Sequence, residues 1–157
     1  MRYFPCTASG GFGVDFRKLT MGERIVAVAG ILLIIDLLFF PWHHVSVSFR
    51  GFTVATVNRT GLQSPRGYLG ILALIITIAM VAQIVLAKLT SVKLPEISMP
   101  WSQAHLIAGF AVLGLLLLKL ILKTDFLGFG AWLGIILAGA VAYGAFTISR
   151  EAQGAAP

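Results

Sequence analysis

Four blocks of apolar residues, each long enough to cross a lipid bilayer, constrain this chain more than any other feature. A helix needs about 20 apolar residues to span ~30 Å of hydrocarbon at 1.5 Å per residue. Only 11% of the 157 residues are charged, whereas soluble domains carry about 25%. We therefore expect an integral membrane protein that contacts the lipid bilayer. The expected spans are residues 23–40, 67–87, 102–122 and 126–148.

These spans predict an all-α membrane protein, a four-transmembrane-helix bundle with a small β-hairpin in the first outer loop. Thr20 and Glu23 have the spacing of a capping box, which starts the first helix. Pro41 ends it, and Trp42 is expected at the membrane interface. Met21 is an alternative start of the protein. The domain organisation is a flexible cytoplasmic tail over 1–19, one membrane domain over 20–149 and a cytoplasmic tail over 150–157.

The outer loop, residues 43–63, has the pattern of two strands. Val45, Val47 and Phe49 alternate with Ser46, Ser48 and Arg50, and a second β-rich run, FTVATV, follows the turn residues Arg50-Gly51. An isolated hairpin is only marginally stable in water. We therefore expect this hairpin to lean on the helix ends or on a protein partner.

Basic residues orient the chain in the membrane. Seven Lys and Arg residues fall on the side of the termini and five on the side of the outer loop, which predicts both termini in the cytoplasm. The net charge of +6 favours contact with anionic lipids. The seven are Arg2, Arg17, Lys18, Arg24, Lys88, Lys93 and Arg150; the five are Arg50, Arg59, Arg66, Lys119 and Lys123.

The stretches DLLFFPW and LLKLILKTDFLGFGAWLGIILAGAVAYGAF, with the overall length, resemble uncharacterised small four-span membrane proteins of actinobacterial type. The resemblance covers most of Gly22 to Glu151 and implies a bacterial cytoplasmic (plasma) membrane, with no particular activity. The topology is also similar to claudin-like tetraspans. The paired outer-loop cysteines and the tryptophan motif of claudins are absent here, so no claudin function is carried over.

Asp36 lies inside the first apolar block and Lys119 inside the third. Both fall about one helical turn from the outer end of their spans, and the two spans run in the same direction. Matched depth and opposite charge predict an intramembrane ion pair, which would lower the cost of an unpaired carboxylate in a span. Lys119 could instead extend outward alone, and Asp36 could reach His43 or His44 or be protonated. A structural role is favoured over transport.

Two further sets of residues point to helix packing. Gly130 and Gly134 form a GxxxG motif, which Ala138 and Ala142 continue at a spacing of four. Small residues allow close approach of helices in lipid. We expect them to pack against the third helix, with homo-oligomer contact as the alternative.

Polar side chains at the inner end of the bundle form another candidate contact. Gln83 and His105 fall at comparable depth, so a hydrogen bond between them is expected, with headgroup-level side chains as the alternative. Asn58-Arg59-Thr60 fits a glycosylation sequon, which would be fortuitous in a bacterial membrane.

Motifs for catalysis are missing from the sequence. There is no nucleophile elbow, phosphate loop or dinucleotide fingerprint, and no cofactor is expected. His43 and His44 alternate on a strand and lack further ligands nearby, so interface residues are favoured over a metal site. No basic run suits nucleic acid, and the one cysteine, Cys6, excludes an intrachain disulfide.

The hypothesis for function is a non-enzymatic structural or accessory subunit of a membrane assembly. The small size, the scarcity of polar groups in the spans and the outer hairpin favour it. The alternative is a small oligomeric transporter or channel, since transport paths are marked by intramembrane ionisable residues.

Overall fold

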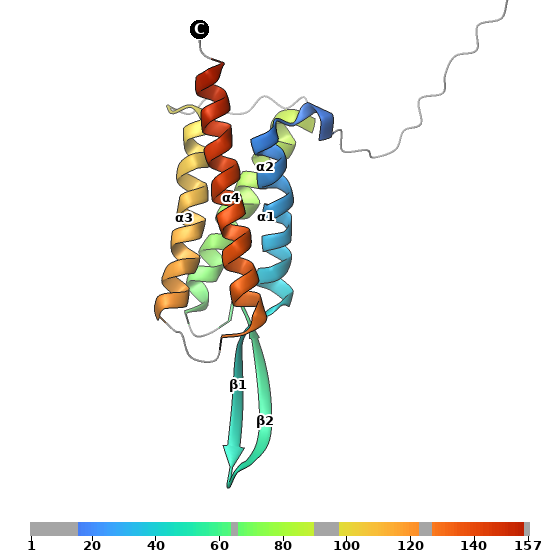
Figure 1. Ribbon diagram of the computed structural model, residues 1–157, viewed down its shortest axis with the longest axis vertical. Coiled ribbons are helices and arrows are strands. Elements are labelled where there is room, and N and C mark those ends of the chain that lie inside the picture. The colour runs from blue at the N-terminus through green and yellow to red at the C-terminus, as the bar shows by residue number, and fades with distance from the viewer. Residues whose placement is uncertain (1–15, 64–65, 90–97, 123–126, 156–157) are drawn as a thin grey trace, which may run out of the picture.

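The computed structural model describes residues 16–63, 66–89, 98–122 and 127–155. Four helices lie side by side and alternate in direction, and a two-stranded hairpin extends from one end of the bundle (Figure 1). The N-terminal end of the first helix and the C-terminal end of the last helix lie at the end of the bundle opposite the hairpin. The elements are η1 (Phe16–Lys18), α1 (Met21–Phe39), β1 (Pro41–Phe49), β2 (Phe52–Thr60), α2 (Gly67–Leu89), α3 (Trp101–Leu122) and α4 (Phe129–Gly154).

Local signals explain where α1 begins and ends. The capping box forms: the Glu23 backbone N–H donates to Thr20 Oγ1 at 3.4 Å, and the Thr20 N–H donates to Glu23 Oε2 at 2.9 Å. Pro41 starts the following strand, because a proline cannot donate the next helical hydrogen bond. Leu19, expected in a flexible tail, is buried against the core.

Three of the helices within the described ranges, α2, α3 and α4, are long and apolar enough to cross a membrane. These helices indicate a multi-pass membrane protein. The expected four spans include α1, which is not among these three helices because it carries Glu23, Arg24 and Asp36 within 19 residues. Arg150 to Gly154, expected as a tail, continue α4 because no proline interrupts the helix.

The β-hairpin predicted in the first outer loop is present. Its strands pair antiparallel, and its two turn residues have positive φ angles, 49° at Arg50 and 82° at Gly51. Two such residues define the turn type whose twist matches that of the strands, and glycine adopts the second position without strain. The ladder is irregular between Val47 and Ser48.

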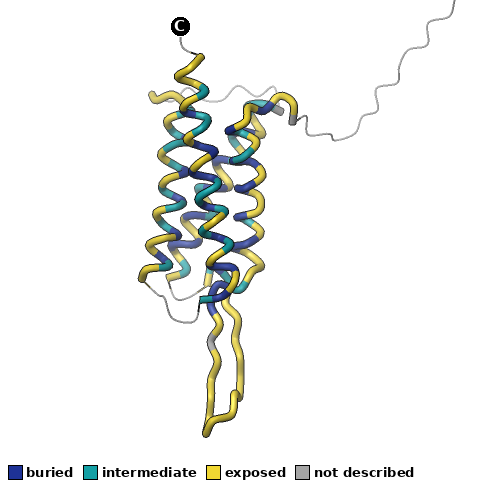
Figure 2. The backbone as a smooth tube through the Cα atoms, in the orientation of Figure 1, coloured by how far each residue is buried: buried dark blue, intermediate teal, exposed yellow. Residues whose placement is uncertain are grey.

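The core runs along the axis of the bundle and includes Trp42 at the base of the hairpin, whereas the rest of the hairpin lies outside it (Figure 2). Large apolar side chains also remain exposed around all four helices, and on α2, α3 and α4 these surfaces are compatible with lipid contact. Examples from each helix are Ile31 at 48%, Ile75 at 59%, Ile107 at 60% and Ile136 at 68% exposure.

Candidate functional site

A buried polar cluster joins the base of the hairpin to the helices, and Asp36 is its first member. Asp36 lies on the face of α1 that also carries Val26 and Leu33, and its side chain is 0% exposed. Its Oδ2 accepts a hydrogen bond of 3.0 Å from the indole Nε1 of Trp42. Its Oδ1 has no hydrogen-bond partner among the described residues. The carboxylate therefore holds Trp42, six residues later, against the end of its own helix.

Lys119 enters the same cluster from α3. Its side chain is 1% exposed, so the ammonium does not extend outward from the bundle. Nζ donates a hydrogen bond to the backbone carbonyl of Gly61, just after β2. It also lies 5.3 Å from the centroid of a Trp42 ring, within the range of a cation–π contact. Lys119 thereby fixes the strand that leaves the hairpin, whereas Asp36 fixes the strand that enters it.

Asp36 and Lys119 share a tryptophan but do not form the predicted ion pair. Within the described part of the chain, the one ion pair with N–O separation up to 4.0 Å joins Lys88 to Glu23, at 3.4 Å. The prediction of matched depth located both residues at the hairpin end of the bundle. The prediction of direct contact is wrong, because the Trp42 indole N–H takes Oδ2 and the Gly61 carbonyl takes the ammonium.

Glycines make room for this cluster. A Cβ atom on Gly134 of α4 would lie 2.6 Å from Asp36 Oδ2 and would also collide with the Trp42 ring. A Cβ atom on Gly70 of α2 would lie 3.2 Å from Lys119 Nζ and would collide with the Gly61 carbonyl. The Asp36 carboxylate and the Lys119 ammonium can therefore form their contacts only because α4 and α2 have no side chain at Gly134 and Gly70.

The start of α4 holds the hairpin base from a third side. The Gly128 backbone N–H donates to the Trp42 carbonyl at 2.8 Å, and His43 forms a β-bridge with Leu127. Trp42 and His43 are 1% and 3% exposed. Both are enclosed by protein rather than exposed as predicted for interface residues, because they lie at the base of the hairpin against the ends of α1 and α4. His44, on the opposite face, donates from Nδ1 to Asn58 Oδ1 at 2.7 Å.

The small residues of α4 serve two contacts rather than the single predicted one. Gly130 and Gly134 face the end of α1 and the hairpin base, whereas Ala142 lies against Gly109 of α3. A Cβ atom on Gly109 would be 3.2 Å from the Ala142 Cα. Ala138 is also buried. Because all four predicted packing residues are buried within one chain, none is on the surface for an oligomer contact.

Gln83 and His105 line one groove between α2 and α3 but form no hydrogen bond with each other. The predicted contact is wrong: the His105 Nδ1 lies 3.0 Å from the Trp101 carbonyl of its own helix, and Nε2 has no hydrogen-bond partner among the described residues. That carbonyl can only accept, so Nδ1 donates. The rest of the groove is apolar, lined by residues such as Ile76 and Met80.

Metal-binding geometry is missing from the part of the chain that the structure describes. No three His, Cys, Asp or Glu side chains gather there. His43 is buried while His44 is exposed, so the two imidazoles lie on opposite sides of the strand. Cys6 lies outside the described residues.

Comparison with known proteins gives no relative. No family model matches the chain, and neither the curated proteins nor the solved structures contain a match. The role of this chain must therefore be inferred from its own residues and geometry.

Proposed function

We propose that this chain is a four-span protein of a bacterial cytoplasmic membrane, with α1 as the fourth span and both termini in the cytoplasm. Two observations support α1 as a span. Its outward face is apolar, with Ile31 and Leu38 at 48% and 41% exposure, and Asp36, its one charge beyond the first turn, is buried. Glu23 and Arg24 lie at the end of the bundle, where headgroups begin. The predicted excess of basic residues at that end supports the orientation and contact with anionic lipids.

The proposed role is that of a non-enzymatic accessory subunit that presents its hairpin to a membrane assembly. One observation carries the proposal: nine-residue strands extend beyond the bundle and contact it only at their base (Figures 1 and 2). Every residue of β2 from Phe52 to Arg59 is exposed. A free two-stranded ribbon of this kind is marginal in water, so a partner that covers it would account for its length.

The polar cluster fits this role because it fixes where the hairpin points. Trp42, at the start of β1, and Gly61, just after β2, both lie at the base of the hairpin. Asp36 of α1 binds the first, and Lys119 of α3 binds the second. A hairpin tied to two helices keeps one direction relative to the bundle. Pre-orientation lowers the conformational entropy lost when a partner binds.

The test is purification in mild detergent of the full chain and of a variant with a short hairpin. Replacing residues 47–55 by Asn-Gly joins Ser46 to Thr56, which are paired in the ladder, and leaves the base untouched. We expect a defined partner to accompany the full chain and to be lost with the short hairpin, while the melting temperature changes little. A partner retained by the short variant, or no partner with the full chain, would overturn the proposal.

A second candidate function, a small oligomeric transporter or channel, is favoured by one observation. Asp36 is fully buried, and one of its carboxylate oxygens has no hydrogen-bond partner in the described residues. Ionisable groups inside membranes often mark ion or proton paths. Proton flux into liposomes that stops with Asp36→Asn, but not with Glu23→Gln, would favour transport over the accessory role.

A further inference from the structure

The hairpin has two chemically different faces. Directly opposite residues of an antiparallel pair project to the same side. Phe49 faces Phe52, and Val47 faces Ala55. Val57 continues this side, because residues two apart on a strand share a face. The apolar face extends from the tip toward the base, and its exposed members are Val47 at 54%, Phe49 at 68%, Phe52 at 78% and Val57 at 47% exposure.

The paired residues of the other face are polar, and the exposed Val54, at 67%, falls at the irregularity of the ladder and has no partner across it. Ser48 faces Thr53, Ser46 faces Thr56, and His44 is hydrogen-bonded to Asn58. A polar face needs no cover in water, whereas a continuous exposed apolar strip marks an interaction site. The two faces therefore predict binding from one side only.

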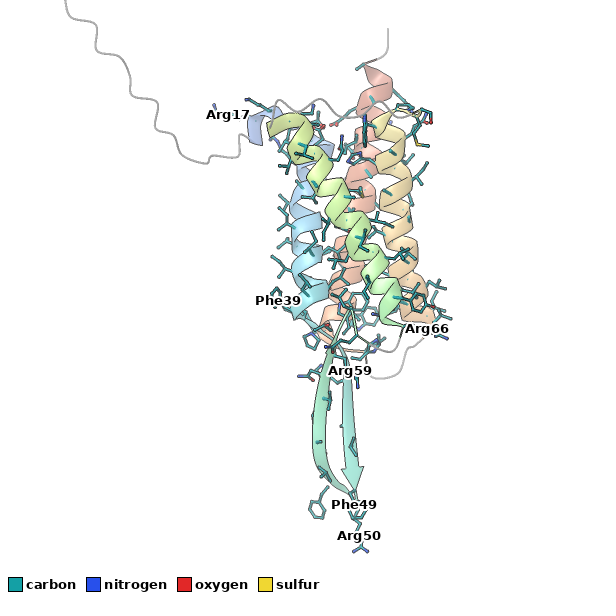
Figure 3. The ribbon with its side chains drawn as sticks, turned by 180° about the vertical axis from the view of Figure 1, so that it is seen from behind. Arg17, Phe39, Phe49, Arg50, Arg59 and Arg66 are labelled. Carbon is teal, nitrogen blue, oxygen red and sulfur yellow. The ribbon has the colours of Figure 1, made fainter. Side chains whose placement is uncertain are left out.

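The charges around the apolar face have one sign. Residues 41–66 contain three arginines and no Asp or Glu. Arg50 lies at the tip, with its guanidinium 5.8 Å from the Phe49 ring centroid, and Arg59 lies toward the base (Figure 3). Arg66 is used within the fold, since its Nη1 donates to the Leu122 carbonyl at 2.9 Å. Arg50 and Arg59 thus place a positive charge near each end of the apolar face.

This pattern distinguishes between the surfaces that could cover the hairpin. A second copy of the chain would bring the same apolar strip but also the same arginines, and like charges in an interface oppose association. The chain's own bilayer is out of reach, because the buried base directs the hairpin away from the helices (Figure 1). An opposing membrane would meet only the tip and leave Val57 in water.

We propose that the apolar face, defined by Val47, Phe49, Phe52 and Val57, binds a protein whose own apolar strip is bordered by Asp or Glu residues near Arg50 and Arg59. This inference rests on the proposed accessory role and names the chemistry of its partner. The partner buries the valines and phenylalanines, and its carboxylates accept hydrogen bonds from the two guanidinium groups.

A photo-crosslinking residue tests which face is covered. Benzoylphenylalanine is placed at Val57 or, as a matched control, at the adjacent Thr56 on the polar face, in the full chain in native membranes. We expect at least a tenfold stronger crosslink to one protein from position 57, through a peptide that contains Asp or Glu. Equal crosslinks from both positions, a product of twice the chain mass, or crosslinks to lipid alone would overturn the inference.

Two matched sets of variants test the contacts separately. Val57→Asn should reduce the partner recovered in mild detergent at least tenfold, whereas Thr56→Asn should not. Arg50→Gln combined with Arg59→Gln should reduce it further, and the corresponding lysine pair should restore it. Loss that is the same for both asparagine variants, or no effect of the glutamine pair, contradicts the inference while leaving the accessory role intact. Absence of any partner with the unaltered chain overturns both.

Discussion

Gly134 of α4 offers the sharpest test of how the hairpin is anchored. Replacing it with alanine adds one methyl group where Asp36 Oδ2 would be 2.6 Å away and the Trp42 ring would overlap it. The helix backbone on one side and the buried ring on the other leave little room for relaxation. The indole must therefore move away from the carboxylate, and the hydrogen bond between Trp42 Nε1 and Asp36 Oδ2 is lost.

The magnitude follows from three contributions. Overpacking a close-packed site costs about 1–3 kcal/mol, and leaving a buried polar group without its partner costs about 1–3 kcal/mol more. Alanine is favoured over glycine within a helix by roughly 0.5–1 kcal/mol, which acts in the opposite direction. We expect Gly134→Ala to lower the free energy of unfolding by about 1–5 kcal/mol.

Gly139 provides the control on the same helix. A Cβ atom there has no heavy atom within 4 Å apart from its immediate neighbours, so Gly139→Ala should leave stability unchanged or raise it by up to about 1 kcal/mol. The measurement is unfolding by denaturant in one detergent, with tryptophan fluorescence as the signal. Equal changes in the free energy of unfolding for the two variants would show that Gly134 does not determine how the Trp42 ring packs.

Other substitutions test the same cluster and the threading of the chain. Trp42→Phe keeps a ring but removes the indole donor, so it should cost about 1–3 kcal/mol in chemical unfolding; adding Asp36→Leu should recover part of the loss, and no recovery would contradict the role of the hydrogen bond. Because Asp36 and Lys119 meet only through Trp42, the coupling between Asp36→Asn and Lys119→Met in a double-mutant cycle should be about 0.5–1 kcal/mol, and strictly additive losses would separate the two residues. With the native cysteine removed, a cysteine at Ser48 should react with a membrane-impermeant thiol reagent applied outside, and one at Gln153 should not; the reverse labelling would invert the proposed orientation.

Much of the fold could be predicted because its signals are local. Apolar length predicts the helices, the alternation after Pro41 predicts the hairpin, and the capping box at Thr20 is formed as expected. The polar composition of Arg150 to Gly154 predicts a tail, whereas these residues continue α4 because they include helix formers such as Glu151 and Ala152. Composition alone does not distinguish a polar helical end from a tail.

The candidate site was predicted only in part, because its contacts depend on how the hairpin base packs against the helix ends. Depth along a helix predicts Asp36 and Lys119 at one level, and both contact the base of the hairpin. The depth of a residue along a helix does not say which way its side chain points around the helix axis, or which other groups compete for it. The roles of Trp42 and the Gly61 carbonyl therefore could not be inferred from the sequence. One signal was available: Trp42, an indole donor, follows the Asp36 carboxylate by six residues, just beyond the proline that ends the helix.

The placement of the polar groups favours orientation of the hairpin over stability as their purpose. A buried charged group costs several kcal/mol to desolvate, and well-packed apolar residues often replace buried ions without loss of stability. A leucine at position 36 or 119 would pack as the rest of the core does, yet it could not bind an indole N–H or a backbone carbonyl. Asp36 and Lys119 use these directional bonds on the two sides of the hairpin base. Because hydrogen bonds have a preferred direction, the cluster holds the apolar face of the hairpin in one orientation relative to the helices, which is what the proposed accessory role requires.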